Sequence, residues 1–276
     1  MFPKLIEIGP FYLPTYGVLV ALGFLAGLWL TGRLARERGL NPESIQNLAV
    51  YCALAGLLGA KLTMIAFDWK LYWRQPGEIF SWETLQAAGV YQGGFLLAFV
   101  AAVWLVRRYR LPALTTMDAF APGVALGHAI GRIGCFAAGC CWGTSCNRPW
   151  AVEFTNVDAA RLTGVPLGQP LHPSQLYESI AEFLICGALW NLFRRQPRPG
   201  VVFGLYLVLY SIVRFFIEFV RFHAQQPPFG GTLSNTQWIS MGMALGGLAL
   251  LLRQERVPAP GTAPTMSAGP GPVSHR

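Results

Sequence analysis

Residues 127–143, GHAIGRIGCFAAGCCWG, carry chemically active side chains within a stretch that is otherwise apolar. His128, Arg132 and Cys135 follow one another at intervals of four and three residues, so a helix would place them on one face. The planar guanidinium of arginine matches phosphate because it presents a fork of donors. Glycines between these residues allow close approach by a helix or a ligand. The segment therefore predicts a buried site for an anion such as a phospholipid headgroup.

A second apolar segment carries a polar stripe of the same kind. Its intervals of four, four and three residues predict that four side chains share one helical face. They are Tyr210, Arg214, Glu218 and Arg221. Ionisable groups in a membrane span are costly and need a reason. Two interpretations remain open: an internal ion-pair network that only holds helices together, or an anion site, which the small number of acids in the apolar segments favours.

The composition indicates which solvent surrounds these segments. The chain of 276 residues is 53% hydrophobic and 12% charged, against about 25% charged residues in ordinary soluble domains. A bilayer core of about 30 Å takes around 20 apolar residues to cross. Stretches of suitable length lie at 11–32, 44–67, 91–107, 114–138, 175–193, 200–222 and 233–252. The sequence therefore predicts an all-α, polytopic membrane protein with about seven transmembrane helices.

The positions of lysine and arginine predict the orientation of these helices. The connections after the first, third, fifth and seventh stretches carry three cations each, twelve in all, whereas the opposite side holds six. Because cationic connections stay in the cytoplasm, we expect the N-terminus outside and the C-terminus inside. The net charge of +8 then follows from orientation. It gives no evidence for nucleic-acid binding, since no basic stripe interleaved with aromatic residues occurs.

The rest of the chain divides into one membrane domain and a tail. Residues 1–256 form the expected transmembrane domain, whose long outer connections are 68–90 and 139–174. The second connection contains RPWAVEFTN, an alternating segment that predicts a short strand and with it a small periplasmic cap. Residues 257–276 are rich in proline, glycine, alanine and serine, so we expect a disordered cytoplasmic tail.

Several motifs lie in order along almost the whole membrane domain. They are Tyr16–Gly17, Gly59–Lys61, Gln92–Gly94, HPSQLYE at His172–Glu178, and YSIVRFFIEFVR at Tyr210–Arg221. Residues 131–143, GRIGCFAAGCCWG, keep in register the residues Gly131, Arg132, Gly134, Phe136 and Gly143 of a Gly-Arg-x-Gly-Asn-Phe-x-Asn-x-Glu-x-x-Gly motif. With these motifs the chain resembles the prolipoprotein diacylglyceryl transferase family.

The resemblance implies an activity, a location and partners. The reaction would move a diacylglyceryl group from phosphatidylglycerol to the lipobox cysteine of a preprolipoprotein signal peptide, in the bacterial inner membrane and without a cofactor. Its partners would be membrane lipid and signal peptides, and not nucleic acid. The residues expected to be catalytic are Arg132, Arg214, His128, Tyr16 and Gln92. Those expected to bind substrate are Arg132, Arg214, Arg221, Tyr210, Glu218, Gly143, Lys61, His172 and Tyr177.

Three of the departures from the family pattern matter for the chemistry. Gln92 stands where the family commonly has histidine, Cys135 replaces the motif asparagine, and Cys140 replaces the motif glutamate. Glutamine cannot accept a proton at neutral pH, so another group must supply the base. Our hypothesis is that His128 or a cysteine of the cluster compensates.

Cysteines are concentrated just after the Arg132 segment. The cluster consists of Cys135, Cys140, Cys141 and Cys146. In an oxidising periplasm these residues favour disulfides, and packing as free thiols is the alternative. A metal site is the least favoured of the three alternatives and none is expected, because the spacing lacks the C-x2-C element of zinc sites. Cys52 and Cys186 lie in apolar stretches and are expected to pack as small hydrophobic residues.

Other functions remain open at this point. A membrane thiol redox protein would use Cys135, Cys140, Cys141 and Cys146, but it leaves Arg214 and the HPSQLYE motif without a purpose. An anion transporter would be favoured by inverted repeats, which the sequence does not contain. A divergent member of the resembled family with an altered acceptor or lipid is the third alternative.

Overall fold

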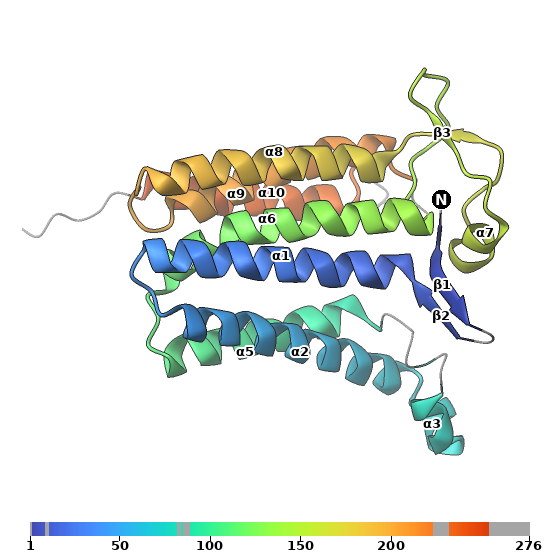
Figure 1. Ribbon diagram of the computed structural model, residues 1–276, viewed down its shortest axis with the longest axis horizontal. Helices are drawn as coiled ribbons and strands as arrows, with labels where there is room; N and C mark the ends of the chain where they lie inside the picture. The colour runs from blue at the N-terminus through green and yellow to red at the C-terminus, as the bar shows by residue number, and fades with distance from the viewer. Residues whose placement is uncertain (1, 9–10, 82–83, 85–88, 223–231, 254–276) are drawn as a thin grey trace, which may run out of the picture.

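The structure, a computed structural model, describes residues 2–8, 11–81, 84, 89–222 and 232–253. Within these residues long helices lie side by side at the seven expected positions (Figure 1). They are α1 Thr15–Glu37, α2 Pro42–Phe67, α5 Tyr91–Arg108, α6 Ala113–Ala138, α8 Ser174–Arg194, α9 Val201–Ile217 and α10 Asn235–Leu252. The short helical segments are α3 Trp69–Arg74, η1 Pro76–Phe80, α7 Val157–Thr163 and η2 Glu218–Val220.

Four segments of the described chain are long and apolar enough to cross a membrane. They are Thr15–Glu37, Pro42–Phe67, Ser174–Arg194 and Val201–Val220. The predicted membrane protein of mostly helical structure is therefore confirmed, and four of the expected spans meet this criterion.

The helices are arranged around a central pair (Figure 1). α1 packs against α6, α2 and α5 form a second pair beside α1, and α8, α9 and α10 lie on the other side of α6. Glycines allow the central pair to approach closely. A Cβ atom on Gly27 would lie 2.6 Å from the carbonyl oxygen of Gly123, and one on Gly23 would lie 2.8 Å from that of Gly127. Small residues of this kind let helix backbones meet inside a membrane.

A buried carboxylate fixes α9 relative to α6. Asp118 of α6 accepts hydrogen bonds from the backbone N–H groups of Gly200, at 2.7 Å, and Phe203, at 2.8 Å. These donors lie at the N-terminus of α9, where the helix dipole favours a negative charge. The contact sets how far α9 slides along α6, and so it aligns the polar residues farther along both helices.

The helix of the first apolar stretch begins later than predicted. Residues 11–32 were expected to form a span, but Phe11–Pro14 is strand β2, which pairs antiparallel with β1 Lys4–Ile8, and α1 begins at Thr15. Pro14 lacks the N–H group needed inside a helix and disfavours helical geometry in the residue before it. The apolar character of this stretch therefore extends beyond its helix.

A small cap stands beyond one end of the helices (Figure 1). The strand expected in RPWAVEFTN is present as β3 Val152–Glu153, which pairs antiparallel with β4 Pro170–Leu171. The cap has its own core, in which Phe154 is fully buried. Its helix α7 is joined to the hairpin of β1 and β2 by an ion pair of 3.2 Å between Lys4 and Asp158. The tail predicted at 257–276 lies outside the described residues.

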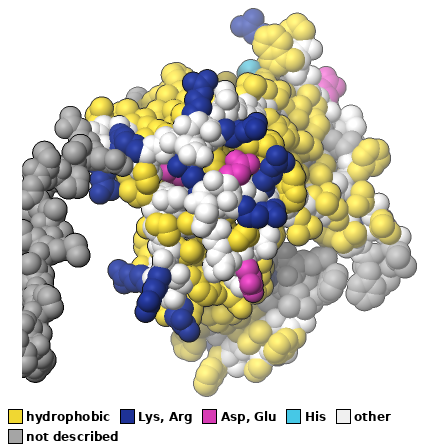
Figure 2. Space-filling model, turned by 60° about the vertical axis from the view of Figure 1, so that its left-hand side comes forward, with side chains coloured by type: hydrophobic (Ala, Val, Ile, Leu, Met, Phe, Trp, Pro, Cys, Tyr) yellow, Lys and Arg dark blue, Asp and Glu magenta, His cyan; other side chains and the backbone are white. Residues whose placement is uncertain are grey.

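The opposite end of the molecule carries the connections between α1 and α2, α5 and α6, and α8 and α9 (Figure 1). Figure 2 shows lysine and arginine side chains gathered on this end, with few acidic ones among them, and hydrophobic side chains along the flanks. This separation of charge is the one predicted from the arginines in the connections.

Candidate active site

Glu178 is the centre of a buried group of charges near the cap. Its side chain, on α8, is only 4% exposed. Its Oε1 atom lies 2.9 Å from Nη1 of Arg214 on α9 and 3.7 Å from Nη1 of Arg221, and its Oε2 atom pairs with Nε of Arg132 on α6. We call Arg132, Arg214 and Arg221 around Glu178 the arginine cluster. Segments that are distant in sequence, α6, α8 and the end of α9 with the residues that follow it, thus bring three guanidinium groups to one carboxylate.

His128 lies one helical turn before Arg132 and contacts it. The Nε2 atom of His128 accepts a hydrogen bond of 3.2 Å from Nε of Arg132. Its Nδ1 atom lies 3.3 Å from Oε1 of Glu182, a carboxylate whose side chain is 1% exposed. Because Nε2 is an acceptor, the proton of a neutral ring belongs on Nδ1, where it faces Glu182. The predicted helical face of His128, Arg132 and Cys135 is confirmed, since Nη1 of Arg132 lies 4.0 Å from Sγ of Cys135.

The predicted stripe on α9 is correct up to Glu218 and wrong beyond it. Nη2 of Arg214 lies 2.9 Å from Oε2 of Glu218, whose Oε1 accepts a hydrogen bond of 2.7 Å from Ser234. α9 ends at Ile217 and η2 follows, so Arg221 has extended backbone and does not continue the helical face. Arg221 reaches the cluster instead because its backbone pairs with Gly143.

The buried arginines are accompanied by several buried acids, so the expectation of few acids in the apolar segments is wrong. Glu178, Glu182 and Glu218 are buried, with 3%, 1% and 6% of each residue exposed. Buried charges require such partners. Glu178 and Glu182 are separated by four residues within an apolar stretch, and that pattern alone marks them as intramembrane acids that need a reason.

Two tyrosines border the cluster. The ring of Tyr210 lies 5.7 Å from that of His128 and 5.8 Å from that of Tyr206, measured between centroids. Tyr16 is in the first turn of α1, where its ring lies against Gly134: a Cβ atom there would be 3.4 Å from the Tyr16 ring. Of the predicted tyrosines, Tyr210 and Tyr16 therefore lie beside α6.

The predicted residues Gly143, His172 and Tyr177 lie where the cap meets the helices. A Cβ atom on Gly143 would lie 2.5 Å from the carbonyl oxygen of Val220 and 2.6 Å from Cβ of His172. The backbone N–H of Gly143 donates to the His172 carbonyl at 3.0 Å. The His172 ring is bonded to the Tyr177 hydroxyl at 3.1 Å. Gly143 thus contacts His172 through the backbone, and His172 contacts Tyr177 through its side chain.

The structure does not bring Lys61 and Gln92 into the cluster. Lys61 is on α2 and its ammonium group donates to the Thr84 carbonyl. Gln92 is exposed in the first turn of α5. Among the described residues, no hydrogen bond or ion pair joins Gln92 to Arg132 or His128. The pair of helices that carries both residues packs beside α1 (Figure 1).

Three cysteines meet at the end of α6 nearest the cap. The Sγ atoms of Cys135, Cys140 and Cys141 all lie within 4.8 Å of one another, and we call this group the thiol triad. Cys146 is buried but is not part of the triad. All six cysteines of the chain are free thiols in the structure. Hydrogen bonds from Cys135 and Cys140, with the charges of Arg221 and Arg132, lower the pKa of the Cys141 thiol.

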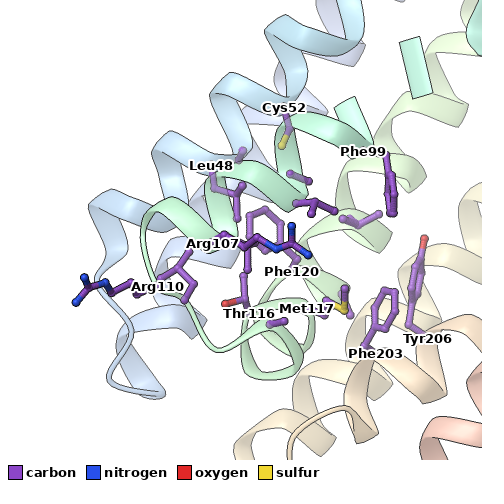
Figure 3. Close-up of a pocket in the computed structure, with 18 residues that line it drawn as sticks. Leu48, Cys52, Phe99, Arg107, Arg110, Thr116, Met117, Phe120, Phe203 and Tyr206 are labelled. Carbon is purple, nitrogen blue, oxygen red and sulfur yellow. The ribbon is translucent and has the colours of Figure 1, made fainter. Parts of the chain in front are cut away.

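A separate apolar cavity of about 800 Å³ lies among α2, α5, α6 and α9 (Figure 3). Phe99, Phe120 and Phe203 line it, the guanidinium group of Arg107 reaches in among the lining side chains, and that of Arg110 points away from them. The part of α6 that lines the cavity ends at Val124, before the arginine cluster begins. Its lining can hold hydrocarbon but offers few groups for acid–base or nucleophilic chemistry.

The apolar helices and the buried arginine cluster define an integral membrane protein with a charged site at the end of the bundle next to the cap. The chain belongs to the prolipoprotein diacylglyceryl transferase family, whose model matches residues 3–253. The residues of the arginine cluster all lie within this match.

Similar proteins come from distant bacteria and carry one name, phosphatidylglycerol–prolipoprotein diacylglyceryl transferase. The protein of Synechococcus elongatus is 36% identical over 258 residues, which cover 90% of this chain and 86% of that protein. The protein of Clostridium tetani is 34% identical over 253 residues, covering 90% and 96%. That of Nitratidesulfovibrio vulgaris is 36% identical over 263 residues, covering 91% and 93%.

Proposed function

We propose that this protein transfers the diacylglyceryl group of phosphatidylglycerol to the lipobox cysteine of preprolipoproteins, the first step of bacterial lipoprotein maturation. Membership of the family and the activity named for its relatives support this function. The observation that carries it is the arginine cluster, in which three guanidinium groups converge on Glu178 and one of them, Arg214, also pairs with Glu218.

In this reaction the cluster binds the phosphate of the lipid and stabilises it as it leaves. The acceptor sulfur attacks the glyceryl carbon, the carbon–oxygen bond breaks, and glycerol phosphate departs with the electron pair. Negative charge grows on the phosphate as this happens, and donors already in place stabilise it without reorganising. Arg132 and Arg214 are the catalytic donors, because Glu178 already holds both of them at fixed positions. Arg221, Tyr210 and Glu218 support them.

The acceptor thiol must lose its proton before it attacks, because the thiolate is the nucleophile. Gln92 cannot take this proton. The Nε2 atom of His128 could accept this proton, but it already accepts a hydrogen bond from Arg132. His128 can therefore deprotonate the acceptor thiol only after the hydrogen bond from Arg132 has opened. The cysteines beside Arg132, beginning with Cys135, are the other groups near this face of α6 that could accept the proton.

The remaining predicted residues act at the edges of the site. Tyr16 places its ring beside Gly134 of α6, and Gly143 gives the loop room to cross the arginine cluster. His172 and Tyr177 are bonded to each other below the cap, and they would contact the peptide substrate. Gln92 and Lys61 lie on the pair α2 and α5, and they would contact the lipid from that side.

The chain would cross the bacterial inner membrane with all seven long helices. The N-terminus and the cap would be periplasmic, and the cationic end in Figure 2 would be cytoplasmic. The signal peptide of the preprolipoprotein would then present its cysteine at the periplasmic end, where the arginine cluster lies. This arrangement is supported by the distribution of arginine in the connections.

The experiment that tests the function uses purified protein, phosphatidylglycerol vesicles and a lipobox peptide, with the peptide mass as the readout. We expect a diacylglyceryl adduct, and a rate that falls by about 100-fold or more in Arg132→Ala and in Arg214→Ala, as when an oxyanion donor is removed. Arg161→Ala removes an exposed arginine of the cap and should leave the rate unchanged. A wild-type protein that forms no adduct would contradict the proposal.

The thiol triad favours one alternative function, that of a membrane thiol redox protein. Three sulfur atoms within 4.8 Å could exchange disulfides with a partner. The same purified protein separates the two functions, because a redox protein would oxidise or reduce a dithiol peptide and add no diacylglyceryl group. A divergent transferase would give an adduct with a different lipid or acceptor.

A further inference from the structure

The thiol triad lies in a backbone structure that brings distant sulfur atoms together. α6 ends with Gly139 in the left-handed conformation, at φ 77°. The N–H of Cys140 then bonds to the carbonyl of Cys135 at 3.0 Å, and that of Gly139 bonds to Phe136 at 3.2 Å. These are the two bonds of a Schellman motif, in which the chain folds back on the last turn of its helix. The motif therefore places Cys140 beside Cys135 despite their separation of five residues.

The third thiol is held in the same place by its own backbone. Cys141 has a φ of 61°, a conformation that is uncommon for a residue with a side chain. Two buried side chains of α8 fix the loop: Gln175 donates to the Cys140 carbonyl at 2.7 Å and Ser174 to the Cys141 carbonyl at 2.9 Å. The surrounding structure thus determines the position of all three sulfur atoms.

The dimensions of the triad match a metal site. In a tetrahedral zinc site with Zn–S bonds of about 2.3 Å, the sulfur atoms lie about 3.8 Å apart. The separations in the triad, at most 4.8 Å, need to shorten by no more than about 1 Å to reach this value. Structural zinc sites have four protein ligands, whereas catalytic ones have three and an open position. Cys140 and Cys141 are partly exposed, so a fourth ligand can approach from outside.

We propose that Cys135, Cys140 and Cys141 bind one zinc ion as thiolates and leave its fourth position open for the acceptor thiol. Binding releases three protons from the triad and a fourth from the acceptor, all to water, so no protein base is needed. The zinc-bound acceptor sulfur then attacks the glyceryl carbon, and the electron pair of the broken carbon–oxygen bond leaves with glycerol phosphate. The thioether that forms is neutral and dissociates from zinc.

The position of the triad suits this role. Nη1 of Arg132 lies 4.0 Å from Sγ of Cys135, so the proposed phosphate donor and the proposed metal ligand are neighbours. A zinc ion with four thiolates would carry two negative charges, which the adjacent guanidinium groups would stabilise. The metal site is inferred from geometry alone, whereas its role in acceptor activation rests on the proposed function.

The first test measures metal content in full-length protein purified without chelators. We expect about one zinc per chain in the wild type. Cys135→Ala, Cys140→Ala and Cys141→Ala should each lower the zinc content by at least about tenfold. Cys52→Ala and Cys146→Ala are the matched controls, since they remove thiols outside the triad and should keep the metal. A wild-type protein without zinc, with copper instead, or with a disulfide inside the triad would overturn the proposal.

A second measurement uses the wild type alone and does not depend on whether the variants fold. Cobalt replaces zinc, and we expect thiolate-to-cobalt charge-transfer bands that change when a lipobox peptide is added but not when its cysteine is replaced by serine. No such bands would overturn the metal site. Unchanged transfer after verified removal of zinc would overturn the acceptor role while the transferase function stood. Zinc binding without any transfer would leave the site in place and contradict the proposed function.

Discussion

Glu178 makes the buried arginines compatible with one another. Without its carboxylate, the guanidinium groups of Arg132 and Arg214 would face each other with little solvent to screen them. The same contacts keep both groups in fixed orientations, and a phosphate that enters the site can bind without first ordering its donors. One residue thus serves the stability of the helices and the chemistry proposed for the site.

Replacing this carboxylate should therefore affect both properties. We expect Glu178→Gln, which keeps the shape and removes the charge, to destabilise the fold by about 3–5 kcal/mol, the usual cost of breaking a buried ion pair. The measurement is thermal unfolding in detergent, together with the transfer assay. Glu153→Gln changes an exposed carboxylate in the cap and should match the wild type. An unchanged melting temperature for Glu178→Gln would show that the arginines do not depend on this group.

At the residue scale, the sequence indicated the cations and Glu218, whereas the roles of Glu178 and Glu182 were not predicted. Arg132, Arg214 and His128 were found because a charged or polar side chain in an apolar stretch needs a purpose. The same rule applies to Glu182, whose contact with His128 joins α8 to α6. The thiol triad could not be found from spacing, because it depends on the left-handed turn at Gly139 and on bonds from another helix.

At the scale of elements, apolar length predicted the helices well and their ends less well. α6 and α10 begin within about two residues of the predicted stretches, since a span must fill the bilayer. The N-terminal hairpin and the early end of α9 were not predicted. The hairpin depends on local backbone geometry next to proline, and the end of α9 depends on strand-like pairing between Arg221 and Gly143. Hydropathy records neither feature.

Close contact between α1 and α6 gives a prediction at this scale. Gly27→Ala would place a methyl group about 2.6 Å from the Gly123 carbonyl oxygen, so the two helices must move apart. We expect a loss of stability of about 1–3 kcal/mol, typical of overpacking. Gly187→Ala is the matched control, because Gly187 lies in α8 with nothing within 4 Å of the added atom. If thermal unfolding does not distinguish the two variants, the packing of this pair is looser than the glycines indicate.

The whole molecule has two different ends, one with the cap and the other with the exposed arginines of the helix connections. The arginine cluster and the thiol triad both lie toward the cap, whereas the apolar cavity lies toward the cationic end. Arginine residues in short connections hold those connections on the cytoplasmic side of a membrane. The chemistry is therefore expected at the periplasmic surface, where a translocated signal peptide presents its cysteine.

Reporter fusions test this orientation directly. Fluorescent protein joined after Arg110 or Arg253 should fluoresce, because both positions lie in cationic segments expected in the cytoplasm, where the reporter folds. Fusion after Gln75, in the connection between α2 and α5, should give protein without fluorescence, which immunoblotting would detect. Replacing Arg107, Arg108 and Arg110 together by glutamine in the Arg110 fusion should reduce its fluorescence, since those charges retain that connection inside. The reverse pattern across the three fusions would place the arginine cluster on the cytoplasmic side and remove its access to a translocated acceptor.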